Sequence, residues 1–270
     1  MLSNTPGGQR PPGFSFLRPW DIRRRLTSPG WRIVCFDAVG STNDVAAAAG
    51  RGGLAEPLAV FAERQTRGRG RQGRTWRAPS GRALLVSTLW RPSEAPVAGM
   101  VQVSAVAACA ALARFGVEAR LKWPNDLLLG RAKVGGVLIE AAFLGERLDF
   151  VVAGIGLNVL QGDGELPATG YPATSVHLAT GRRLDRAALA AALLDELAAT
   201  YRVWLDVPSA VFARWRSGLD TLGRRVAVER PEGRLVGRAL DVEPDGALLL
   251  ERDDGRLERL VSAEVSARDP

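Results

Sequence analysis

Lysine is nearly absent from a chain that is otherwise rich in cations. Of the 36 basic residues in this 270-residue sequence, only Lys122 and Lys133 are lysines. An arginine guanidinium is a planar fork of donors, whereas the lysine ammonium is a compact point charge that can sit on a carboxylate or phosphate oxygen. Either arginine-favouring codon usage left two lysines by accident, or these two positions require lysine.

Histidine and cysteine are also scarce, which excludes two kinds of site. His177 is the only histidine and stands in an apolar context typical of a structural residue. A metal cage of Cys and His ligands is therefore excluded, and no Ser-His-Asp or Cys-His relay is available. Cys35 and Cys109 lack a CxxC partner, so we expect buried free thiols rather than a disulfide or a metal site.

Long apolar runs are missing too. No stretch approaches the roughly 18 uninterrupted apolar residues of a membrane span, and residues 1–30 lack the apolar core of an export signal. We therefore expect a cytoplasmic protein without a membrane partner. Residues 1–30 are rich in Pro, Gly, Arg and Ser, which predicts a flexible N-terminal arm. The formal net charge of +7 would suit a polyanion, but charge alone does not name the partner.

Hydrophobic periodicity predicts alternating strands and helices between residues 31 and 220. Strands are expected at 31–39, 58–63, 83–90, 119–123, 136–143 and 148–157. Helices are expected at 45–49, 97–115, 184–205 and 211–215. The helix over 97–115 is apolar enough to be buried in the centre of the domain, and Gly145-Glu146 predicts a hairpin between the last two strands.

The pattern changes near residue 220, where we place a domain boundary. Short strands are expected at 225–230, 234–242, 247–252 and 256–261, separated by Pro-Glu-Gly, Pro-Asp-Gly and Asp-Asp-Gly turns. This alternation is typical of a small β-barrel of SH3-like size. The predicted domains are therefore 31–220 and 221–270.

The run from Arg67 to Arg74 alternates arginine with glycine and is followed by Thr75 and Trp76. Glycines let backbone amides converge on an anion, and guanidinium groups supply paired donors to phosphate or carboxylate oxygens. The run is neither a Walker A loop nor the start of a Rossmann helix. Trp76 and a predicted strand on either side favour an ordered loop that folds over a nucleotide, and the alternatives are a disordered segment that binds RNA or a solvated turn.

Three further runs place polar residues or glycines at strand ends or on strands. The run from Lys122 to Asp126 ends a strand at a proline, which exposes an amide and a carboxylate. Lys133 lies just before a pair of glycines at the start of a strand, and the run from Gly154 to Asn158 likewise places glycines and a polar residue on a strand. Each run alone is weak evidence, but together they predict one binding site.

Five motifs now resemble those of biotin protein ligases in type and order. They are Ser41-Thr42-Asn43, Gln65 with the GRGRQGR loop, Lys-Trp-Pro-Asn-Asp, Lys-Val-Gly-Gly-Val-Leu-Ile-Glu and Gly-Ile-Gly-Leu-Asn. The resemblance spans about residues 33 to 265 and implies an α+β fold. That fold is a mixed β-sheet flanked by helices, a class II synthetase-like catalytic domain, with an SH3-like C-terminal barrel. Because the segment before Trp31 is short for a winged helix, the resemblance implies the monofunctional type, which does not bind DNA.

The resemblance also implies a two-step reaction. Biotin and ATP, with Mg²⁺, give biotinyl-5′-adenylate and pyrophosphate, and a lysine of a biotin carboxyl carrier protein then attacks the adenylate. The carrier would belong to acetyl-CoA carboxylase or a related carboxylase, and the ligase would be a monomer or a weak homodimer. No protein nucleophile is needed, which agrees with the absence of a relay.

Matching positions imply roles for individual residues. The residues expected to bind biotin are Ser41, Thr42, Asn43, Gln65, Gly68, Arg69, Trp123 and Gly136. Those expected to bind the nucleotide are Arg71, Trp76, Asn125, Lys133 and Asn158. Lys133 should contact the biotin carboxylate and the α-phosphate, and Arg71 should restrain release of the adenylate. Asp126 should steer or deprotonate the incoming lysine, with Lys122 tuning it; metal ligands are not assigned.

Two other functions remain open from the sequence. A lipoate ligase or octanoyltransferase would share the architecture, although the GRGRQGR loop and the Trp-Pro-Asn-Asp run favour biotin. A basic RNA-binding protein would use the arginine run and the terminal barrel, and it predicts salt-dependent RNA binding without ATP turnover. That alternative leaves the two lysines unexplained.

Overall fold

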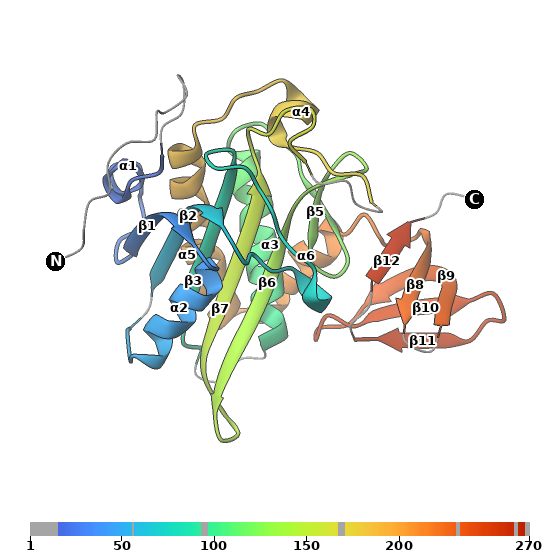
Figure 1. Cartoon of the computed structure of the whole chain (residues 1–270). Coiled ribbons are helices and arrows are strands. Elements are labelled where there is room, and N and C mark those ends of the chain that lie inside the picture. The colour runs from blue at the N-terminus through green and yellow to red at the C-terminus, as the bar shows by residue number, and fades with distance from the viewer. Residues whose placement is uncertain are drawn as a thin grey trace.

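The structure, a computed structural model, describes residues 16–55, 57–92, 97–166, 171–230, 233–261 and 264–267. A seven-stranded sheet in the order β1-β2-β3-β7-β6-β5-β4 forms the larger part of the molecule (Figure 1). Its strands are β1 (Arg32–Val39), β2 (Leu58–Gln65), β3 (Ala83–Trp90), β4 (Arg120–Lys122), β5 (Asp126–Leu129), β6 (Ala132–Leu144) and β7 (Arg147–Asn158). β1 and β2 run parallel and the other neighbours antiparallel, so the expected mixed sheet is confirmed.

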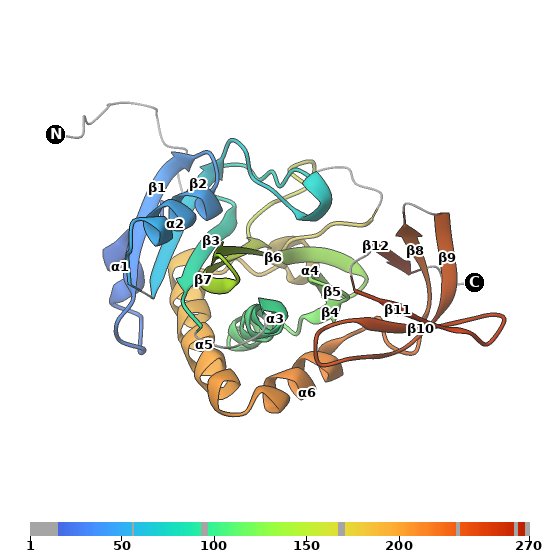
Figure 2. The same cartoon turned by 90° about the horizontal axis from the view of Figure 1, so that it is seen from below.

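Helices cover both faces of this sheet (Figure 2). They are α1 (Pro19–Arg23), α2 (Thr42–Arg51), α3 (Val97–Ala113), α4 (Val176–Thr180), α5 (Arg186–Asp206) and α6 (Pro208–Gly218). α3 lies between the sheet and α5 and α6, and its apolar sequence is buried on nearly all sides, as expected. α2 packs on the opposite face over a smaller apolar cluster that includes Val60, Leu89 and Phe150. No helix in the described ranges has the length and apolarity needed to cross a membrane.

Some predicted boundaries were wrong, and one strand was missed. After Lys122 the chain turns at Trp123–Asn125 and returns as β5, which pairs antiparallel with β4. The sequence shows only a proline there, because a strand of four residues carries little periodic signal. α2 begins at Thr42 rather than Val45, so Ser41 occupies the N-cap position and the Ser-Thr-Asn motif opens the helix.

The described part of the N-terminal arm, residues 16–30, packs against the domain, whereas residues 1–15 lie outside the described residues, so the flexible arm stays a prediction. Ile22 of α1 is fully buried, and the Leu17 amide donates to Glu63 Oε1 at 2.6 Å. The Ser28 amide donates to Asp195 Oδ1 at 2.7 Å. Apolar side chains and carboxylate acceptors therefore hold a segment whose composition indicates flexibility.

The C-terminal unit is an antiparallel sheet in the order β11-β10-β9-β8-β12, consistent with an SH3-like domain. Its strands are β8 (Arg225–Arg230), β9 (Gly233–Val242), β10 (Leu248–Arg252), β11 (Leu257–Leu260) and β12 (Glu264–Ala267). The expected barrel is not closed, because the edge strands β11 and β12 do not pair within the described residues. The turn between β9 and β10 contacts the larger unit, where Gln102 Nε2 donates to the Pro244 carbonyl at 2.9 Å.

Candidate functional site

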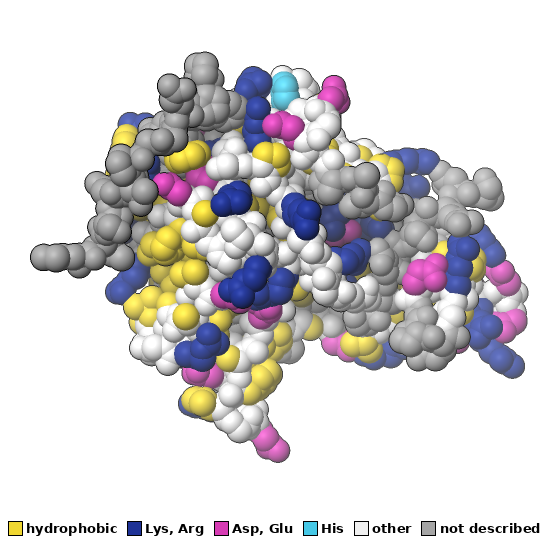
Figure 3. Space-filling view, viewed as in Figure 1, with side chains coloured by type: hydrophobic (Ala, Val, Ile, Leu, Met, Phe, Trp, Pro, Cys, Tyr) yellow, Lys and Arg dark blue, Asp and Glu magenta, His cyan; other side chains and the backbone are white. Residues whose placement is uncertain are grey.

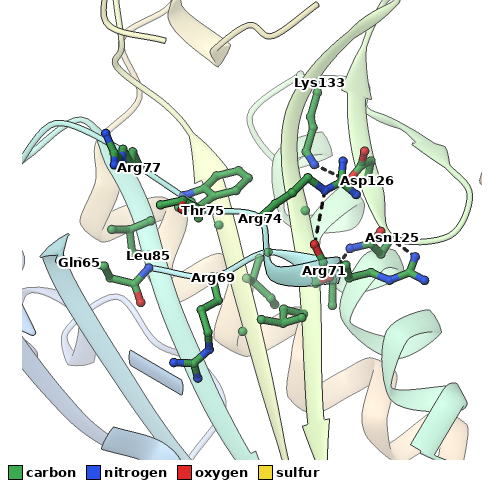
Figure 4. A pocket seen from close by; sticks show the side chains of 18 of the residues that line it. Gln65, Arg69, Arg71, Arg74, Thr75, Arg77, Leu85, Asn125, Asp126 and Lys133 are labelled. Atoms are coloured by element: carbon green, nitrogen blue, oxygen red, sulfur yellow. Dashed lines mark hydrogen bonds and ion pairs between the residues drawn. The ribbon is translucent and has the colours of Figure 1, made fainter. Parts of the chain in front are cut away.

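The arginine-glycine loop crosses the face of the sheet opposite α3 (Figure 2). A cavity of about 450 Å³ lies between this loop and the sheet (Figure 4). The sequence-predicted residues that line it are Ser41, Thr42, Asn43, Gln65, Arg69, Arg71, Trp76, Lys122, Asn125, Asp126, Lys133, Gly136 and Asn158. Residues from all five separated motifs of the sequence therefore meet in one space. The loop that covers them is ordered and carries the short 3₁₀ turn Arg71–Gly73.

Strand register explains why distant residues meet here. Lys122 pairs with Asp126, Asp126 with Gly136, Gly136 with Gly156, and Gly156 with Leu85. Side chains in one row across a sheet point to the same face. This row supplies the cavity with a cation, a carboxylate, two glycines and an apolar wall.

Glycines on β7 make room for side chains of the protein itself. A Cβ on Gly156 would lie 2.7 Å from the Trp76 ring, and a Cβ on Gly154 would overlap Asn43 Oδ1. Because side chains alternate along a strand, Gly154, Gly156 and Asn158 all face the cavity. The two glycines of the Gly-Ile-Gly-Leu-Asn motif thus leave space on the sheet for the side chains of Trp76 and Asn43.

One end of the cavity is a network of neutral polar groups. Gln65 Oε1 accepts hydrogen bonds from the Thr42 amide at 2.8 Å and from Thr42 Oγ1 at 3.1 Å. Ser87 Oγ lies 2.7 Å from Thr42 Oγ1 and 2.5 Å from Asn43 Oδ1. Ser41, Thr42 and Asn43 are buried, so this end can exchange hydrogen bonds with a polar neutral ligand out of contact with water.

The other end carries the charged groups (Figure 4). Lys133 Nζ lies 2.5 Å from Asp126 Oδ1 and 5.7 Å from the centroid of the Trp76 ring. Arg71 Nη1 donates to Asn125 Oδ1 at 3.3 Å. Both lysines of the chain line this cavity together with arginines of the loop, and Figure 3 shows several separate Lys and Arg side chains on this face of the molecule. Such an end suits a phosphate or carboxylate ligand.

Arg69 has a different position from the other loop arginines. Its guanidinium donates to both oxygens of Asp44, at 3.1 and 2.7 Å, and to Glu140 Oε1 at 3.1 Å. The Arg69 hydrogen bond is the main cause that holds the pKa of Asp44 below its usual range, and it outweighs the opposing effect of burial. Asn43 Nδ2 also donates to Glu140, at 2.7 Å.

Two predicted site residues do not line the cavity. Trp123 is buried, and its indole N–H donates to the Gly246 carbonyl at 2.8 Å, so its expected contact with biotin stays a prediction. The chain turns after Lys122, so that Trp123 contacts the turn between β9 and β10 of the C-terminal sheet whereas Lys122 lines the cavity. Gly68 belongs to the loop but does not line the cavity, and a Cβ on it would be 2.5 Å from the Trp76 carbonyl oxygen.

Several lining residues were missed by the sequence analysis. Tyr171 places its ring centroid 3.7 Å from Lys122 Nζ, and Glu229 reaches the cavity from β8 of the C-terminal sheet. Arg74 belongs to the arginine run but received no role. Ser87 does not line the cavity but hydrogen-bonds to Thr42 and Asn43 at its polar end, and it offered one signal: it starts the Ser-Thr pair that interrupts the otherwise apolar sequence of β3. Glu229 offered none, because a charged residue on a short strand usually faces solvent.

Residues interpreted as structural lie outside the cavity. Cys35 and Cys109 are free, and burial raises the pKa of each thiol to about 12, so both stay protonated at neutral pH. His177 is on α4 and does not line the cavity. Among the described residues, no group of three or more His, Cys, Asp or Glu side chains could hold a metal ion.

Two family models match the chain. The model of the biotin/lipoate A/B protein ligase family matches residues 36–158, which include both lysines and the arginine-glycine loop. The model of the biotin protein ligase C terminal domain matches residues 221–268, which include the C-terminal sheet.

Individual relatives agree with these matches. The chain is 36% identical to the biotin--[acetyl-CoA-carboxylase] ligase of Mycobacterium tuberculosis, over 82% of this chain and 84% of the relative. It is 30% identical to the bifunctional ligase/repressor BirA of Bacillus spizizenii, over 87% of this chain and 74% of the relative. The structure of the biotin protein ligase from Aquifex aeolicus in complex with biotin and ATP is similar, with a TM-score of 0.74 and 27% identity over 88% of this chain and 99% of that one.

Proposed function

The chain belongs to the biotin protein ligase family, and we propose that it attaches biotin to a lysine of a biotin carboxyl carrier protein. It is an ATP-dependent ligase that uses biotin and ATP as substrates. The observation that carries the proposal is the cavity itself, because neutral polar groups line one end and Lys133, Asp126 and the loop arginines line the other. That division matches a ligand with a neutral ring at one end and a carboxylate at the other.

The reaction proceeds in two steps. A carboxylate oxygen of biotin forms a bond to the α-phosphorus of ATP, and the bond from that phosphorus to the bridging oxygen breaks, which releases pyrophosphate. The amine of the acceptor lysine then attacks the acyl carbon of the adenylate. AMP leaves, the amine loses a proton, and an amide bond remains. The protein positions charges and excludes water, and it forms no covalent intermediate of its own.

The polar end holds the neutral ring of biotin. Thr42, Asn43 and Ser87 already form a hydrogen-bonded network with Gln65, so the ligand meets groups whose orientation is set in advance. The apolar chain of biotin lies along the wall formed by Leu85 and Leu138, and its carboxylate then points toward Lys133.

The charged end stabilises the negative charge that moves during both steps. The Lys133 ammonium can contact the biotin carboxylate and an α-phosphate oxygen in turn, because three donors on a flexible stem follow a moving charge. Arg71 and Asn125 close over the phosphate, and Trp76 and Asn158 line the space for the nucleotide. Asp126, which contacts Lys133, is within reach to accept the proton of the acceptor amine.

Magnesium enters as part of the substrate MgATP. The described residues hold no preformed cluster for a metal, but Mg²⁺ usually needs only one or two carboxylates in addition to substrate phosphates and water. Asp126 and Glu229 are carboxylates that line the cavity and fit this requirement. An ion held there would neutralise phosphate charge on the substrate.

ATP–pyrophosphate exchange with purified protein and Mg²⁺ tests the first step. Biotin, lipoate and octanoate are compared as the acid that supports exchange, and a biotin carboxyl carrier domain is then added to follow transfer. We expect exchange with biotin alone, followed by labelling of one carrier lysine. Exchange with lipoate would assign the site to lipoate ligases, and no exchange with any acid would overturn the proposal.

A further inference from the structure

The ammonium of Lys122 lies against the face of an aromatic ring. Its Nζ is 3.7 Å from the centroid of the Tyr171 ring, and only 8% of the lysine is exposed. A cation over an aromatic ring is attracted by the negative charge of the ring face, and the attraction is stronger where water is excluded. Tyr171 therefore stabilises the charge of one of the two lysines that line the cavity.

Backbone hydrogen bonds fix the position of Tyr171. The Lys133 amide donates to the Pro172 carbonyl and the Thr174 amide donates to the Lys133 carbonyl, both at 2.8 Å. Asn158 Nδ2 also donates to the Thr174 carbonyl, at 3.0 Å. The segment that follows Tyr171 is therefore bonded to β6, which carries the second lysine, and to the last residue of β7.

The backbone around Lys122 is held on both sides. The Leu121 carbonyl accepts a hydrogen bond from the Asp220 amide at 2.7 Å, and the Trp123 amide donates to Thr221 Oγ1 at 2.9 Å. The remaining freedom of Lys122 is in its flexible four-carbon stem, which loses rotamer entropy when its end is placed. The contact with the aromatic ring offsets that loss at the end of the stem.

Asp126 is adjacent to both lysines. It pairs with Lys122 across β4 and β5, so the two side chains leave the same face of the sheet. The Lys133 ammonium lies 2.5 Å from Asp126 Oδ1 (Figure 4). Burial is the main cause that raises the pKa of Tyr171, and the charge of Asp126 adds to it, so the phenol is close to this carboxylate and stays protonated at neutral pH.

Resting on the proposed function, we propose that Tyr171 is a positioning residue for the transfer step, because its ring holds the Lys122 ammonium beside Asp126. A substrate carboxylate or phosphate that binds Lys133 draws that cation away from Asp126. A mostly buried carboxylate without a cation binds a proton more readily, and a protonated carboxylate cannot accept the proton of the acceptor amine. Lys122, held in place by Tyr171, is then the cation that keeps Asp126 ionised.

The scarcity of lysine makes the contact directly measurable by NMR. Protein labelled with ¹³C-lysine gives signals from only two lysine side chains, and Lys122→Arg assigns them. Protons over the face of an aromatic ring are shifted upfield. The Hε signal of Lys122 should therefore move downfield in Tyr171→Leu and stay upfield in Tyr171→Phe, which keeps the ring. The Lys133 signal is the internal control for a wider disturbance of the site.

The rates of the two steps test the role in transfer. Single-turnover transfer of biotin from preformed biotinyl-adenylate to a carrier domain should be about tenfold slower in Tyr171→Leu, whereas biotin-dependent pyrophosphate exchange and the KM for biotin should be nearly unchanged. Tyr171→Phe should transfer biotin close to the rate of the unaltered chain. Phenylalanines with one, two or three ring fluorines at position 171 weaken the negative ring face with little change in size, so transfer should slow with each fluorine.

The proposal is wrong if the Lys122 signal is the same in Tyr171→Leu and the unaltered chain, or if the transfer rate is independent of fluorination. Equal losses of exchange and transfer in Tyr171→Leu would also overturn it, because a role in transfer alone leaves exchange intact. Failure of the proposed function is a separate outcome, since NMR requires no catalysis. An upfield Lys122 signal in a chain without biotin-dependent exchange would keep the contact with Tyr171 and refute the assigned activity.

Discussion

Lys133 Nζ lies 2.5 Å from Asp126 Oδ1, and this ion pair joins two adjacent strands at the charged end of the cavity. The side chains are only partly exposed, at 27% and 16%, so solvent screens the pair less than a fully exposed one. A substrate carboxylate or phosphate that approaches Lys133 must share it with Asp126. The pair therefore links binding of the anion to the carboxylate proposed to receive the proton of the acceptor amine.

Lys133→Arg should abolish adenylation although the charge is kept. The planar guanidinium cannot occupy the position of the ammonium beside both Asp126 and a substrate oxygen. We expect biotin-dependent ATP–pyrophosphate exchange to fall by about 10²-fold or more. Arg131→Lys, a cation exchange two residues away, serves as the control. Exchange at the rate of the unaltered chain would refute the role of Lys133.

Arg71→Gly should release biotinyl-adenylate instead of retaining it. The side chain closes on Asn125 at the charged end, and its loss opens the route for the adenylate to leave. We expect biotin to appear on lysines of a bystander protein, as detected by avidin blotting, with near-normal pyrophosphate exchange. Arg77→Gly, which alters the loop without removing the contact to Asn125, is the control. If exchange itself stops, Arg71 acts in catalysis and does not restrain the adenylate.

Gly156→Ala should displace the Trp76 indole. The added Cβ would lie 2.7 Å from the ring, closer than van der Waals contact permits. Overpacking of this kind costs about 1–3 kcal/mol of folding free energy, and the KM for ATP should rise. At the control position Gly52, a Cβ would lie 3.4 Å from its nearest neighbour. If Gly156→Ala and Gly52→Ala unfolded at equal urea midpoints, the idea that Gly156 leaves space for the Trp76 ring would be wrong.

Trp123→Phe should weaken the contact between the two sheets and leave biotin binding unchanged. The variant keeps an aromatic ring but loses the hydrogen bond to the Gly246 carbonyl. We expect the free energy of unfolding to fall by about 1 kcal/mol, with the KM for biotin unchanged. A higher KM for biotin at unchanged stability would reinstate Trp123 as a biotin contact.

Asp195 should make the free energy of unfolding depend on pH in the acid range. Burial alone would raise the pKa of this carboxyl, but hydrogen bonds from Ser28 and Thr27 outweigh it and lower the pKa below its value of 3.8 in the unfolded chain. The stabilisation is therefore present above that pH and is lost as the pH falls through the lower, folded pKa. Asp195→Asn should lower the free energy of unfolding by about 1.5–3 kcal/mol at pH 7, and the difference should shrink toward pH 3. A difference that is constant between pH 7 and pH 3 would contradict this assignment.

Local patterns were sufficient to predict most elements. The apolar run of α3 indicates a helix buried all round, and its boundaries differ from the predicted ones by two residues or fewer. The short strand β5 and the packing of α1 were not predictable, because each is stabilised by contacts with residues distant in the sequence. The same limit applies to the site: the sequence identifies the motif residues but does not show which of their side chains face the cavity.

The sequence by itself determined the types of chemistry available: two lysines, an arginine-glycine loop, glycines at alternate positions of a strand, and no relay. These follow from composition and spacing, which folding does not alter. The tertiary structure decided which of these residues lie together in the cavity. Strand register put Lys122, Asp126 and Gly156 in one row. The turn after β4 placed Trp123 against the C-terminal sheet, and packing of that sheet on the larger unit brought Glu229 to the cavity. Side-chain direction depends on pairing across strands, and this pairing is set by packing of the whole chain.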